Sequence, residues 1–464
     1  MIKIFNHYFH RRTVLQVVLD MGLIMGALVV TLMLQAGHHM FDARALSDGV
    51  SRGVLMALGM LAINAGLGFY ERARKFSAGQ MRARGVLSFL LSAGVVLAVL
   101  TLMPLDGSYD VDAAWMAVLG TTAVMLVHRV VVGETLPKSF TRQKVLVYGT
   151  GARARSVGKS LIASDPNVEL VGYFTSPTEQ SHEVSTWGIL SPDMRLPDVV
   201  RQNQVDEIVV ALTERRGGSM PMRDLLDCKL QGVRVVDIAK HFEQNLGQIR
   251  LDSVSAGWLI FGDGFNQGVM RTLVKRLFDI AGASVLLLLA APLMLVTAVL
   301  ILLESGAPIL YRQERVGLNG RVFNVVKFRS MRTDAEKDGV PRWATAGDSR
   351  VTRLGKIIRK IRVDELPQLF SVLKGDMSLV GPRPERPFFV DQLTQEIPFY
   401  AVRHSVKPGV TGWAQVRYHY GSSVEDTTQK LQYDLYYVKN HSLFLDMVIL
   451  FETVGVVLTG KGAQ

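Results

Sequence analysis

Two adjacent carboxylates, Asp364 and Glu365, are the residues of this 464-residue chain best suited to chemistry. The same segment runs on through two glycines to Arg383, which stands between Pro382 and Pro384. Neighbouring carboxylates can hold Mg²⁺, or one of them can attack phosphorus while a metal and arginines stabilise the developing charge. Proline on both sides fixes the backbone around the arginine, whose planar guanidinium suits phosphate oxygens.

Further cations accompany this pair along the chain. Lys327 and Arg329 alternate with apolar residues, which places both on one face of an expected strand. Arg359 comes five residues before the first carboxylate. An acid–base site alone would not require so many cations. We therefore interpret the two carboxylates as the catalytic and metal-binding pair, and Lys327, Arg329, Arg359 and Arg383 as phosphate ligands.

Each of these residues also has a purely structural explanation. Asp364 could be only the N-cap of a helix that carries Pro367 in its first turn and ends at Gly375. Glu365 could form an ordinary salt bridge to a nearby arginine, and alternating cations on a strand are commonly a solvated face. The convergence of carboxylates and cations favours the catalytic interpretation.

The elements that would position these groups follow from local patterns. Asn319–Gly320, between alternating apolar positions, predicts a hairpin whose second strand carries Lys327 and Arg329. A second helix is expected from Asp364 to Gly375, and one before it from the helical spacing of an apolar face formed by Leu354, Ile357, Ile358 and Ile361. The second helix should bury the apolar side chains Leu366, Leu369, Phe370 and Leu373.

The N-terminal part of the chain is predicted to form a bundle of membrane-spanning helices. Four apolar runs, at about 14–34, 50–70, 85–105 and 113–132, approach the ~20 residues that cross a bilayer core. The first lacks a signal-peptide cleavage pattern and is kept as a helix. Basic residues gather before the first run, between the second and third, and after the fourth. The positive-inside rule therefore places both ends of the bundle in the cytoplasm.

A fifth apolar run, at about 277–303, has Pro292 near its middle and basic residues on both flanks. Proline kinks a helix, and basic residues at both ends disfavour crossing. A helix that enters the membrane, bends at Ala291–Pro292 and returns to the same face satisfies both facts. A proline-kinked spanning helix remains open from the residues alone.

The middle of the chain, about 143–250, alternates short apolar strands with helices and predicts a Rossmann-like parallel sheet. Gly149, Gly151 and Ala154 fit G-x-G-x-x-A, in which backbone amides could hold a phosphate. No carboxylate follows the second strand until Glu179, so the dinucleotide fingerprint is weak. We interpret this part as a regulatory or assembly domain whose glycines make a tight turn.

Charge and cysteine content narrow the class of protein. A net charge of +11 suits anionic lipid or phosphorylated ligands, although by itself it could also indicate nucleic acid. The single cysteine, Cys228, excludes an internal disulfide and a thiolate metal cluster. Hydrophobic residues make up 48%, which agrees with a membrane protein that has soluble parts.

The C-terminal motifs resemble the bacterial polyprenyl-phosphate sugar-1-phosphate transferases, or monotopic phosphoglycosyl transferases. The matching stretches, spread over about Lys275 to Gly460, are KRLFDI, YRQERVGLNGR, KFRSM, VDELPQLFSVLKGDMSLVGPRPE, KPGVTGWAQV and YDLYYVKN. The preceding bundle and Rossmann-like segment resemble the long form of this family. GWLIFGDGF and AEKDGVPRWA resemble its exopolysaccharide-system branch.

The resemblance implies transfer of a sugar 1-phosphate from a UDP-sugar to undecaprenyl phosphate, with release of UMP. It implies that Asp364 attacks the β-phosphate and carries the sugar phosphate covalently until the lipid phosphate attacks. Glu365 would place Mg²⁺ or assist the lipid phosphate. The resemblance also implies a re-entrant helix bent at Pro292, which would keep Asp364 on the cytoplasmic side, where UDP-sugars are found.

Two departures from the family pattern concern local contacts. Ala291 stands where the family usually has serine before the bend proline, so the proline kink is expected without the serine's hydrogen bond. After GWAQV the chain reads Arg417–Tyr420 where many members carry Asn-Gly-Arg-Asn. The contacts of that loop, to nucleotide or sugar, are therefore left open.

The expected architecture is a membrane protein of α plus α/β class. We expect a four-helix transmembrane bundle over 1–140, a Rossmann-like domain over 141–267, and a catalytic domain over 268–464 that contains the re-entrant helix. The last apolar segment, 443–458, predicts an interfacial helix or a packed soluble one. The expected location is the bacterial inner membrane, with the catalytic domain in the cytoplasm.

The expected partners are a UDP-sugar, undecaprenyl phosphate and the bilayer, and no nucleic acid. A homodimer through the bundle and middle domain is compatible with the sequence, which names neither the oligomeric state nor the sugar. Two other functions stay open: a membrane-anchored nucleotide sensor and a scaffold for polysaccharide export. The intact carboxylate pair argues against the first of these, and the second predicts that a chain without the bundle is inactive.

Overall fold

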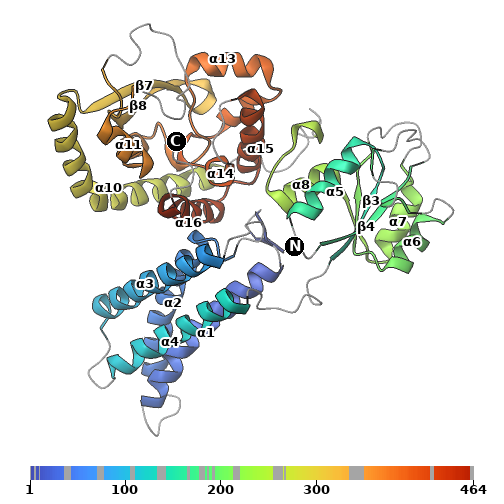
Figure 1. The fold of residues 1–464 in the computed structure, drawn as a ribbon, viewed down its shortest axis with the longest axis horizontal. Helices are drawn as coiled ribbons and strands as arrows, with labels where there is room; N and C mark the ends of the chain where they lie inside the picture. Colours follow the sequence, from blue (N-terminus) through green and yellow to red (C-terminus); the bar gives the residue numbers. More distant parts are fainter. Residues whose placement is uncertain are drawn as a thin grey trace. The chain divides into compact units, whose positions relative to one another are not determined.

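The computed structural model describes residues 2–4, 7–9, 11–35, 43–70, 78–104, 110–132, 143–164, 168–176, 183–184, 188–190, 194–212, 220–253, 265, 268–333, 350–418 and 423–459. Two compact units contain nearly all of these residues, one over Tyr8–Leu246 and the other over Gly247–Gln464. A short ladder of β1 (Ile2–Ile4) and β2 (His7–Phe9) opens the chain (Figure 1). Each unit is described by itself below.

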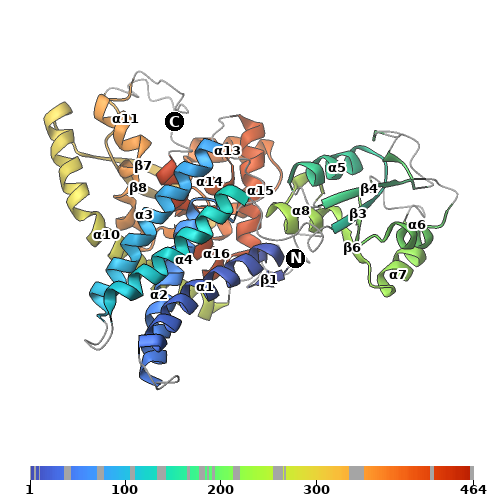
Figure 2. The same ribbon diagram turned by 60° about the horizontal axis from the view of Figure 1, so that its bottom comes forward.

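The first unit begins with the four helices predicted from the apolar runs. They are α1 (Arg11–Gln35), α2 (Ala43–Gly66), α3 (Ala78–Leu102) and α4 (Val111–Val132). Helix α1 packs on α2 and α4, while α3 packs on α2 and α4 (Figure 2). Helices α1, α2 and α3 are long and apolar enough to cross a membrane, and the apolar part of α4 is somewhat shorter.

Few polar side chains lie inside the described part of the bundle, and two of them bond to each other. Ser88 donates to Asn64 at 2.6 Å. Arg52 donates to the carbonyls of Met103 and Pro104 at the end of α3, at 2.9 and 2.7 Å. These bonds satisfy groups that apolar surroundings would otherwise leave without partners.

The α/β part of the first unit is a parallel four-stranded sheet with helices on both faces. The strand order is β4-β3-β5-β6, and neighbouring strands are parallel throughout. The core on one face includes side chains of α5 and α8, and the core on the other face includes those of α6 and α7. In chain order the elements are β3 (Gln143–Tyr148), α5 (Ala152–Ser164), β4 (Val168–Phe174), α6 (Leu196–Asn203), β5 (Glu207–Val210), α7 (Met222–Leu230), β6 (Arg234–Asp237) and α8 (Ile238–Leu246).

The glycine turn of this sheet serves as a tight connection between β3 and α5. Gly149 has φ of +124°, a conformation that favours glycine, and its amide donates to the carbonyl of Phe174 at 2.8 Å. The predicted parallel sheet and its glycine turn are therefore present. A regulatory or assembly role for this part stays a prediction.

The second unit carries the predicted site. It contains α10 (Val269–Ser305), β7 (Leu310–Val316), β8 (Val322–Phe328), α11 (Arg353–Lys360), α12 (Gln368–Lys374), β9 (Ser378–Val380), α13 (Pro387–Glu396), β10 (Gly409–Thr411), α14 (Trp413–Arg417), α15 (Val424–Asn440) and α16 (Leu443–Thr459). The hairpin prediction is confirmed: β7 and β8 pair antiparallel from Leu310–Phe328 to Val316–Val322. At its turn Asn319 and Gly320 have φ of +55° and +77°.

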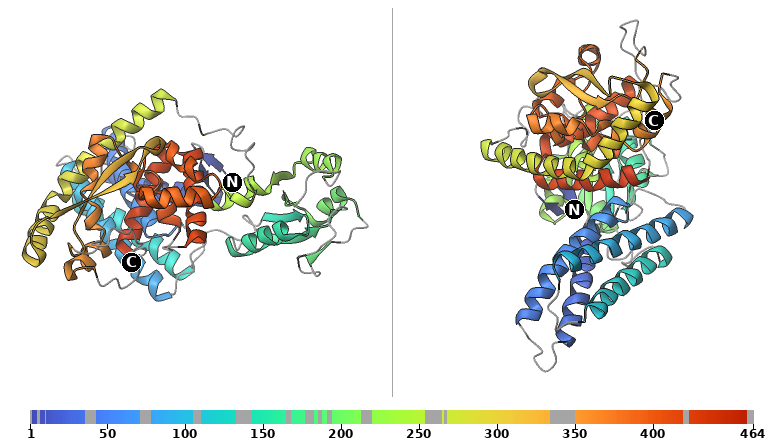
Figure 3. Two further views of the ribbon diagram at one scale, coloured as in Figure 1. Left: turned by 90° about the horizontal axis from the view of Figure 1, so that it is seen from above. Right: turned by 90° about the vertical axis from the view of Figure 1, so that its left-hand side faces the viewer.

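Helix α10 is long, bent and largely exposed. At 1.5 Å per residue its 37 residues would extend about 55 Å if straight, well beyond a bilayer core of ~30 Å. It contains Pro292, and Figures 1 and 3 show two arms that meet at an angle. Only 11% of its most apolar window is buried. A proline kink of this kind was predicted for this run.

The beginning of α10 is bonded firmly to the rest of the second unit. Arg276 donates to the carbonyls of Val372 and Leu373 at the end of α12, at 2.6 and 2.7 Å. Lys275 pairs with Asp446 of α16 at 2.7 Å, and Asp446 is fully buried. Helix α16 is thus packed into the unit, which is one of the two alternatives that its sequence left open.

A segment before α10 also belongs to this core. The indole nitrogen of Trp413 donates to the carbonyl of Gly247 at 2.8 Å, and the amide of Ile249 donates to Gln432 at 3.0 Å. Trp413 is buried and stacks on Tyr436 with ring centroids 5.9 Å apart. The folded second unit therefore begins well before Gly268.

Candidate active site

The two carboxylates lie on a 3₁₀ turn rather than at the start of an α-helix. This turn spans Val363–Glu365, and α12 begins only at Gln368, with Pro367 as its N-cap residue. The purely structural explanation of Asp364 as the N-cap of the following helix is therefore wrong, although α12 does end at Gly375, in the left-handed conformation. Both carboxylates are buried, at 8% and 7% exposure.

The residue before the turn is strained. Arg362 has φ of +59°, which is uncommon for a residue with a side chain and costs on the order of 1–3 kcal/mol. Such conformations gather at functional sites. Here the left-handed residue lies between α11 and the turn that buries both carboxyl groups. Two predicted details of the flanking helices are wrong, because Phe370 and Ile357 are exposed at 56% and 58% instead of packing inward.

Glu365 is held by three cations. Its Oε1 accepts hydrogen bonds from Arg383 at 2.9 Å and Lys327 at 3.3 Å, and it lies 3.6 Å from Nη1 of Arg362. Burial alone would raise the pKa of Glu365, but the three positive charges outweigh burial and hold its pKa well below the usual range. Glu365 is therefore ionised at any physiological pH.

Asp364 is in the opposite situation. Burial and the adjacent negative charge of Glu365 raise the pKa of Asp364 to about 6, against the smaller effects of Lys327, Arg362 and Arg359. Its Oδ1 is buried and has no hydrogen-bond partner among the described residues. Two neighbouring carboxylates with such different pKa values commonly have different chemical roles. The unpaired one is the better candidate for contact with a reacting group.

Three of the four predicted phosphate ligands act on the pair. Lys327 and Arg383 bond to Glu365, and burial lowers the pKa of Lys327 while Glu365 opposes that change. Arg359 lies on α11 and influences Asp364 through its charge; no hydrogen bond from Arg359 to either carboxylate occurs in the described part of the chain. The hairpin, α11 and the loop after β9 thus bring cations to one turn.

The fourth cation, Arg329, is bonded elsewhere. Its Nη2 donates to the carbonyls of Ser305 and Gly306 at 2.9 and 2.6 Å, and to the hydroxyl of Ser305 at 2.7 Å. These groups form the C-terminal end of α10, where a cation also interacts favourably with the helix dipole. Arg329 therefore joins the end of α10 to the end of β8. Its role in phosphate binding stays a prediction.

Two further arginines hold the loop that carries Arg383. Neither was predicted from the sequence to belong to the site. Arg315 of β7 donates to the carbonyl of Pro384 at 3.0 Å and pairs with Glu385 at 3.4 Å. Arg403 donates to the carbonyl of Arg383 at 2.9 Å. Arg315 could have been suspected from its strand next to the hairpin turn. No local pattern points to Arg403.

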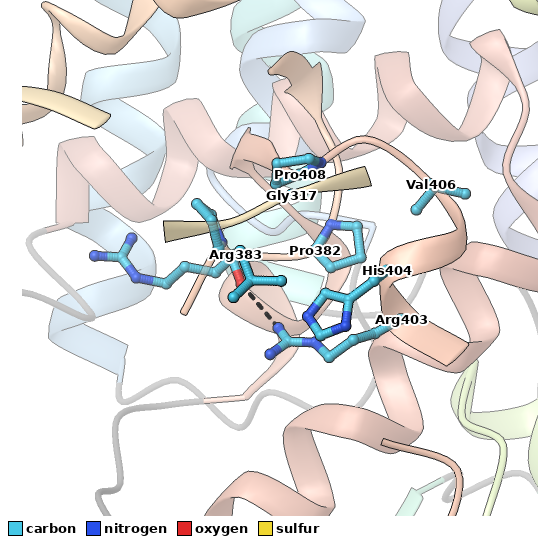
Figure 4. A pocket seen from close by; sticks show the side chains of 9 residues that line it. Gly317, Pro382, Arg383, Arg403, His404, Val406 and Pro408 are labelled. Carbon is cyan, nitrogen blue, oxygen red and sulfur yellow. Dashed lines mark hydrogen bonds between the residues drawn. The ribbon is translucent and has the colours of Figure 1, made fainter. Parts of the chain in front are cut away.

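A small pocket lies behind this loop (Figure 4). Pro382, Arg383, Arg403, His404 and Val406 contribute to its lining. The figure shows the guanidinium of Arg383 extending away from the pocket, while its carbonyl faces Arg403. Burial and the charge of Arg403 lower the pKa of His404 to about 4, so His404 is neutral at physiological pH. The pocket therefore belongs to the support of the loop and lies apart from the carboxylates.

The carboxylate pair could supply only some of the ligands of a Mg²⁺ ion. Among the described residues no three His, Cys, Asp or Glu side chains gather in a way that could hold a metal by themselves. Mg²⁺ is commonly held by one or two carboxylates together with substrate phosphates and water. The buried, unpartnered Oδ1 of Asp364 fits that pattern, whereas Oε1 of Glu365 is occupied by cations.

The chain is similar to known proteins over most of its length. Residues 270–460 match the family described as bacterial sugar transferase. The chain is 47% identical over 242 residues to a UDP-N-acetylgalactosamine-undecaprenyl-phosphate N-acetylgalactosaminephosphotransferase of Aeromonas hydrophila, covering 52% of this chain and 56% of that protein. It is 31% identical over 393 residues to a UDP-glucose:undecaprenyl-phosphate glucose-1-phosphate transferase of Escherichia coli K12, covering 81% of each.

A third relative matches a shorter part of this chain at a higher identity than the Escherichia coli relative does. A protein of Caulobacter vibrioides with the same name as the Escherichia coli relative is 45% identical over 191 residues, which are 41% of this chain and 71% of that protein. The matched part of this chain spans little more than half of the Aeromonas hydrophila relative.

Proposed function

Because this chain belongs to the bacterial sugar transferase family, we propose that it transfers a sugar 1-phosphate from a UDP-sugar to undecaprenyl phosphate. The observation that carries the proposal is the unequal carboxylate pair. Asp364 is buried with an unpartnered oxygen and a raised pKa, while Glu365 is fixed among three cations. The names of the relatives support this donor and this acceptor.

The reaction proceeds in two displacements at one phosphorus. A carboxylate oxygen of Asp364 attacks the β-phosphorus of the UDP-sugar. The bond from that phosphorus to the bridging oxygen breaks, and UMP leaves with the electron pair. A phosphate oxygen of undecaprenyl phosphate then attacks the same phosphorus, releasing the carboxylate of Asp364 and forming sugar-diphospho-undecaprenol. Splitting the transfer this way lets two bulky phosphorylated substrates react one after the other.

The cations of the site have a clear electrostatic task in this scheme. Arg383 is one-third exposed and Lys327 is 18% exposed, so phosphate oxygens can reach both next to Glu365. They would stabilise negative charge on the donor diphosphate as the bridging bond breaks. Glu365 is a poor proton acceptor because its pKa is lowered. We assign it to the placement of Lys327 and Arg383.

We further propose Mg²⁺ as the cofactor, held by Asp364 and Glu365 together with substrate phosphates. When bound, the ion would offset the charge of the diphosphate and of the leaving UMP. Chelation with EDTA should then stop UMP release, and Mg²⁺ should restore it. Activity that persists in EDTA would remove the metal from the proposal.

We propose that α10 is re-entrant in the bacterial inner membrane and that the catalytic unit lies in the cytoplasm. In support, both ends of this helix are bonded to the same unit, through Arg276 at the start and Arg329 at the end. The bend at Pro292 and the exposed apolar surface between these ends suit entry into one leaflet. Exposed Ile357 and Phe370, on either side of the carboxylate turn, suit a position at the bilayer surface.

The wider role follows from the same proposal. The product would be the first lipid-linked sugar of an exopolysaccharide repeat unit, and a homodimer is compatible with the bundle and the α/β part. The sugar itself is decided by experiment. We expect one of UDP-glucose, UDP-galactose, UDP-N-acetylglucosamine or UDP-N-acetylgalactosamine to support UMP release by the purified full chain, dependent on undecaprenyl phosphate.

The decisive variant is Asp364→Asn, which should abolish UMP release and the labelling of the protein by sugar-labelled donor. Asp376→Asn is the matched control, because Asp376 is a carboxylate at the end of α12 that pairs only with the exposed Lys374 in the described structure. It should retain activity. Release of UMP by Asp364→Asn at the wild-type rate would refute the covalent step, and inactivity of the wild type with every donor would refute the proposed function.

A further inference from the structure

The loop that carries Arg383 is held through its carbonyl groups. Proline has no N–H, so Pro382 and Pro384 cannot donate to the surroundings. Four consecutive carbonyls of this loop accept hydrogen bonds: Pro382 from the amide of Gly409 at 3.0 Å, Arg383 from Arg403 at 2.9 Å, Pro384 from Arg315 at 3.0 Å, and Glu385 from the amide of Val316 at 2.9 Å. Two of the four donors are side-chain guanidinium groups.

Arg403 is the more buried of these two arginines and has the more elaborate support. It lies in a 3₁₀ turn, η6 (Tyr400–Ser405), with its side chain 6% exposed. Its Nη2 pairs with Asp434 of α15 at 2.8 Å, and its Nη1 donates to the hydroxyl of Tyr400 at 2.7 Å. One guanidinium therefore joins three parts of the chain: η6, α15 and the loop. Its planar, fork-shaped set of donors suits this task better than the single ammonium of lysine.

The charge balance of this arrangement also matters. The positive charge of Arg403 is neutralised by Asp434, which is only 3% exposed. Arg403 can therefore approach the backbone of another arginine without adding a net positive charge there. Figure 4 shows the guanidinium of Arg383 on the side of the loop away from Arg403. That guanidinium donates to Glu365 at 2.9 Å.

We propose that Arg403, neutralised by Asp434, is a positioning residue that fixes Arg383 through its main-chain carbonyl. It thereby sets how Arg383 holds Glu365 and the phosphate of the donor. Arg403 bonds to neither carboxylate of the pair in the described structure, so it acts only through the loop. The expected effect on kcat rests on the proposed function. The expected effect on the position of the loop rests on the loop geometry alone.

A double-mutant cycle tests the positioning role in the full chain. Arg403→Gln and Asp434→Asn are introduced together, so that no unpaired charge is left buried. The pair of changes should lower kcat for UMP release by about 10- to 100-fold with a smaller change in KM, since a misplaced group costs roughly this much. In an Arg383→Ala background the same pair should cost less than about threefold, because the group that it positions is already gone.

The matched control is a second ion pair of the same unit, between the partly exposed Lys275 and the buried Asp446, 2.7 Å apart and without contact to the loop among the described residues. Lys275→Gln with Asp446→Asn should change kcat by the same factor in both backgrounds. If the Arg403–Asp434 changes lower kcat by an equally large factor in both backgrounds, the proposal is overturned. The loss of kcat would then reflect a general loss of stability.

Hydrogen exchange supplies a readout that does not depend on activity. Exchange of the peptide covering residues 381–386 should rise in the Arg403–Asp434 variant and stay unchanged in the Lys275–Asp446 control. If the first variant does not fold, Tyr400→Phe is measured instead, since it removes one bond of Arg403 and keeps the ion pair. Unchanged exchange in the loop would overturn the positioning role, whereas a wild type that releases no UMP would overturn only the proposed function.

Discussion

Replacing Asp364 by asparagine should abolish transfer and, at neutral pH, make the folded chain more stable. Asp364 is 8% exposed, one of its oxygens has no partner in the described structure, and the negative charge of Glu365 is adjacent. Asparagine keeps the shape of the side chain and removes the charge. The free-energy cost of burying that charge then disappears. Groups kept for function are often held at such a cost.

The magnitude follows from the pKa of Asp364, which is raised from 3.8 to about 6. At about 1.4 kcal/mol per pH unit, the shift corresponds to about 3 kcal/mol. Because the folded-state pKa is the higher one, the stability contribution of Asp364 is fully present below about pH 4 and is lost as the pH rises through about 6. The new amide needs hydrogen-bond partners of its own, so we expect a net gain of about 1–3 kcal/mol at neutral pH.

The assay is thermal unfolding of the full chain in detergent, followed by tryptophan fluorescence. In a domain of about this size, 1 kcal/mol changes Tm by roughly 2–4 °C. The Tm of Asp364→Asn should therefore exceed that of the wild type by several degrees at neutral pH. At about pH 4 the two values should approach each other, because the wild-type carboxyl group is then protonated in the folded state.

Glu365→Gln is the matched control, since it removes the same charge one residue away. The pKa of Glu365 is lowered because its negative charge is surrounded by Arg383, Lys327 and Arg362. Neutralising Glu365 leaves these cations without their common partner, so Tm should fall. A lower Tm for Asp364→Asn at neutral pH, or a gain that is just as large at about pH 4, would refute the assignment of a buried, unpaired charge to Asp364.

Three further predictions concern the reaction, the core and the topology. Since Asp364 must be ionised to attack, kcat/KM for UMP release should fall about tenfold per pH unit below a pH of about 6. A kcat/KM that stays constant down to about pH 5 would contradict this. Gly247→Ala should lower stability by roughly 1–3 kcal/mol in thermal unfolding, because φ of Gly247 is +61° and a Cβ would lie 2.9 Å from the ring of Trp413. An unchanged Tm would show that the segment around Gly247 does not pack against Trp413. Cysteines placed at the exposed Ser47 and Lys374 should react with an impermeant maleimide from opposite sides of the membrane, and labelling from one side only would refute the bundle topology.

Local patterns were sufficient for much of the architecture. The turn at Asn319–Gly320, the apolar runs of the bundle, the alternation of strands and helices and the bend of the proline-containing helix α10 each depend on neighbouring residues, and each is present in the structure. The alternative explanation of Asp364 as a helix N-cap was wrong. Whether the chain turns as a 3₁₀ or an α-helix there depends on the left-handed Arg362 and on contacts made by distant elements.

Residue types and order by themselves determined which groups could do chemistry: two adjacent carboxylates, a set of cations and a proline-bound arginine. Only the tertiary structure decided which contacts, and therefore which roles, each of these groups has. Lys327 reaches Glu365 from 38 residues away, Arg329 binds the end of α10 instead, and Arg403 holds the loop of Arg383 from 20 residues away. The pKa values of the two carboxylates differ for the same reason. Burial and the distance to a charge set a pKa, and both are created by contacts between residues far apart in the sequence.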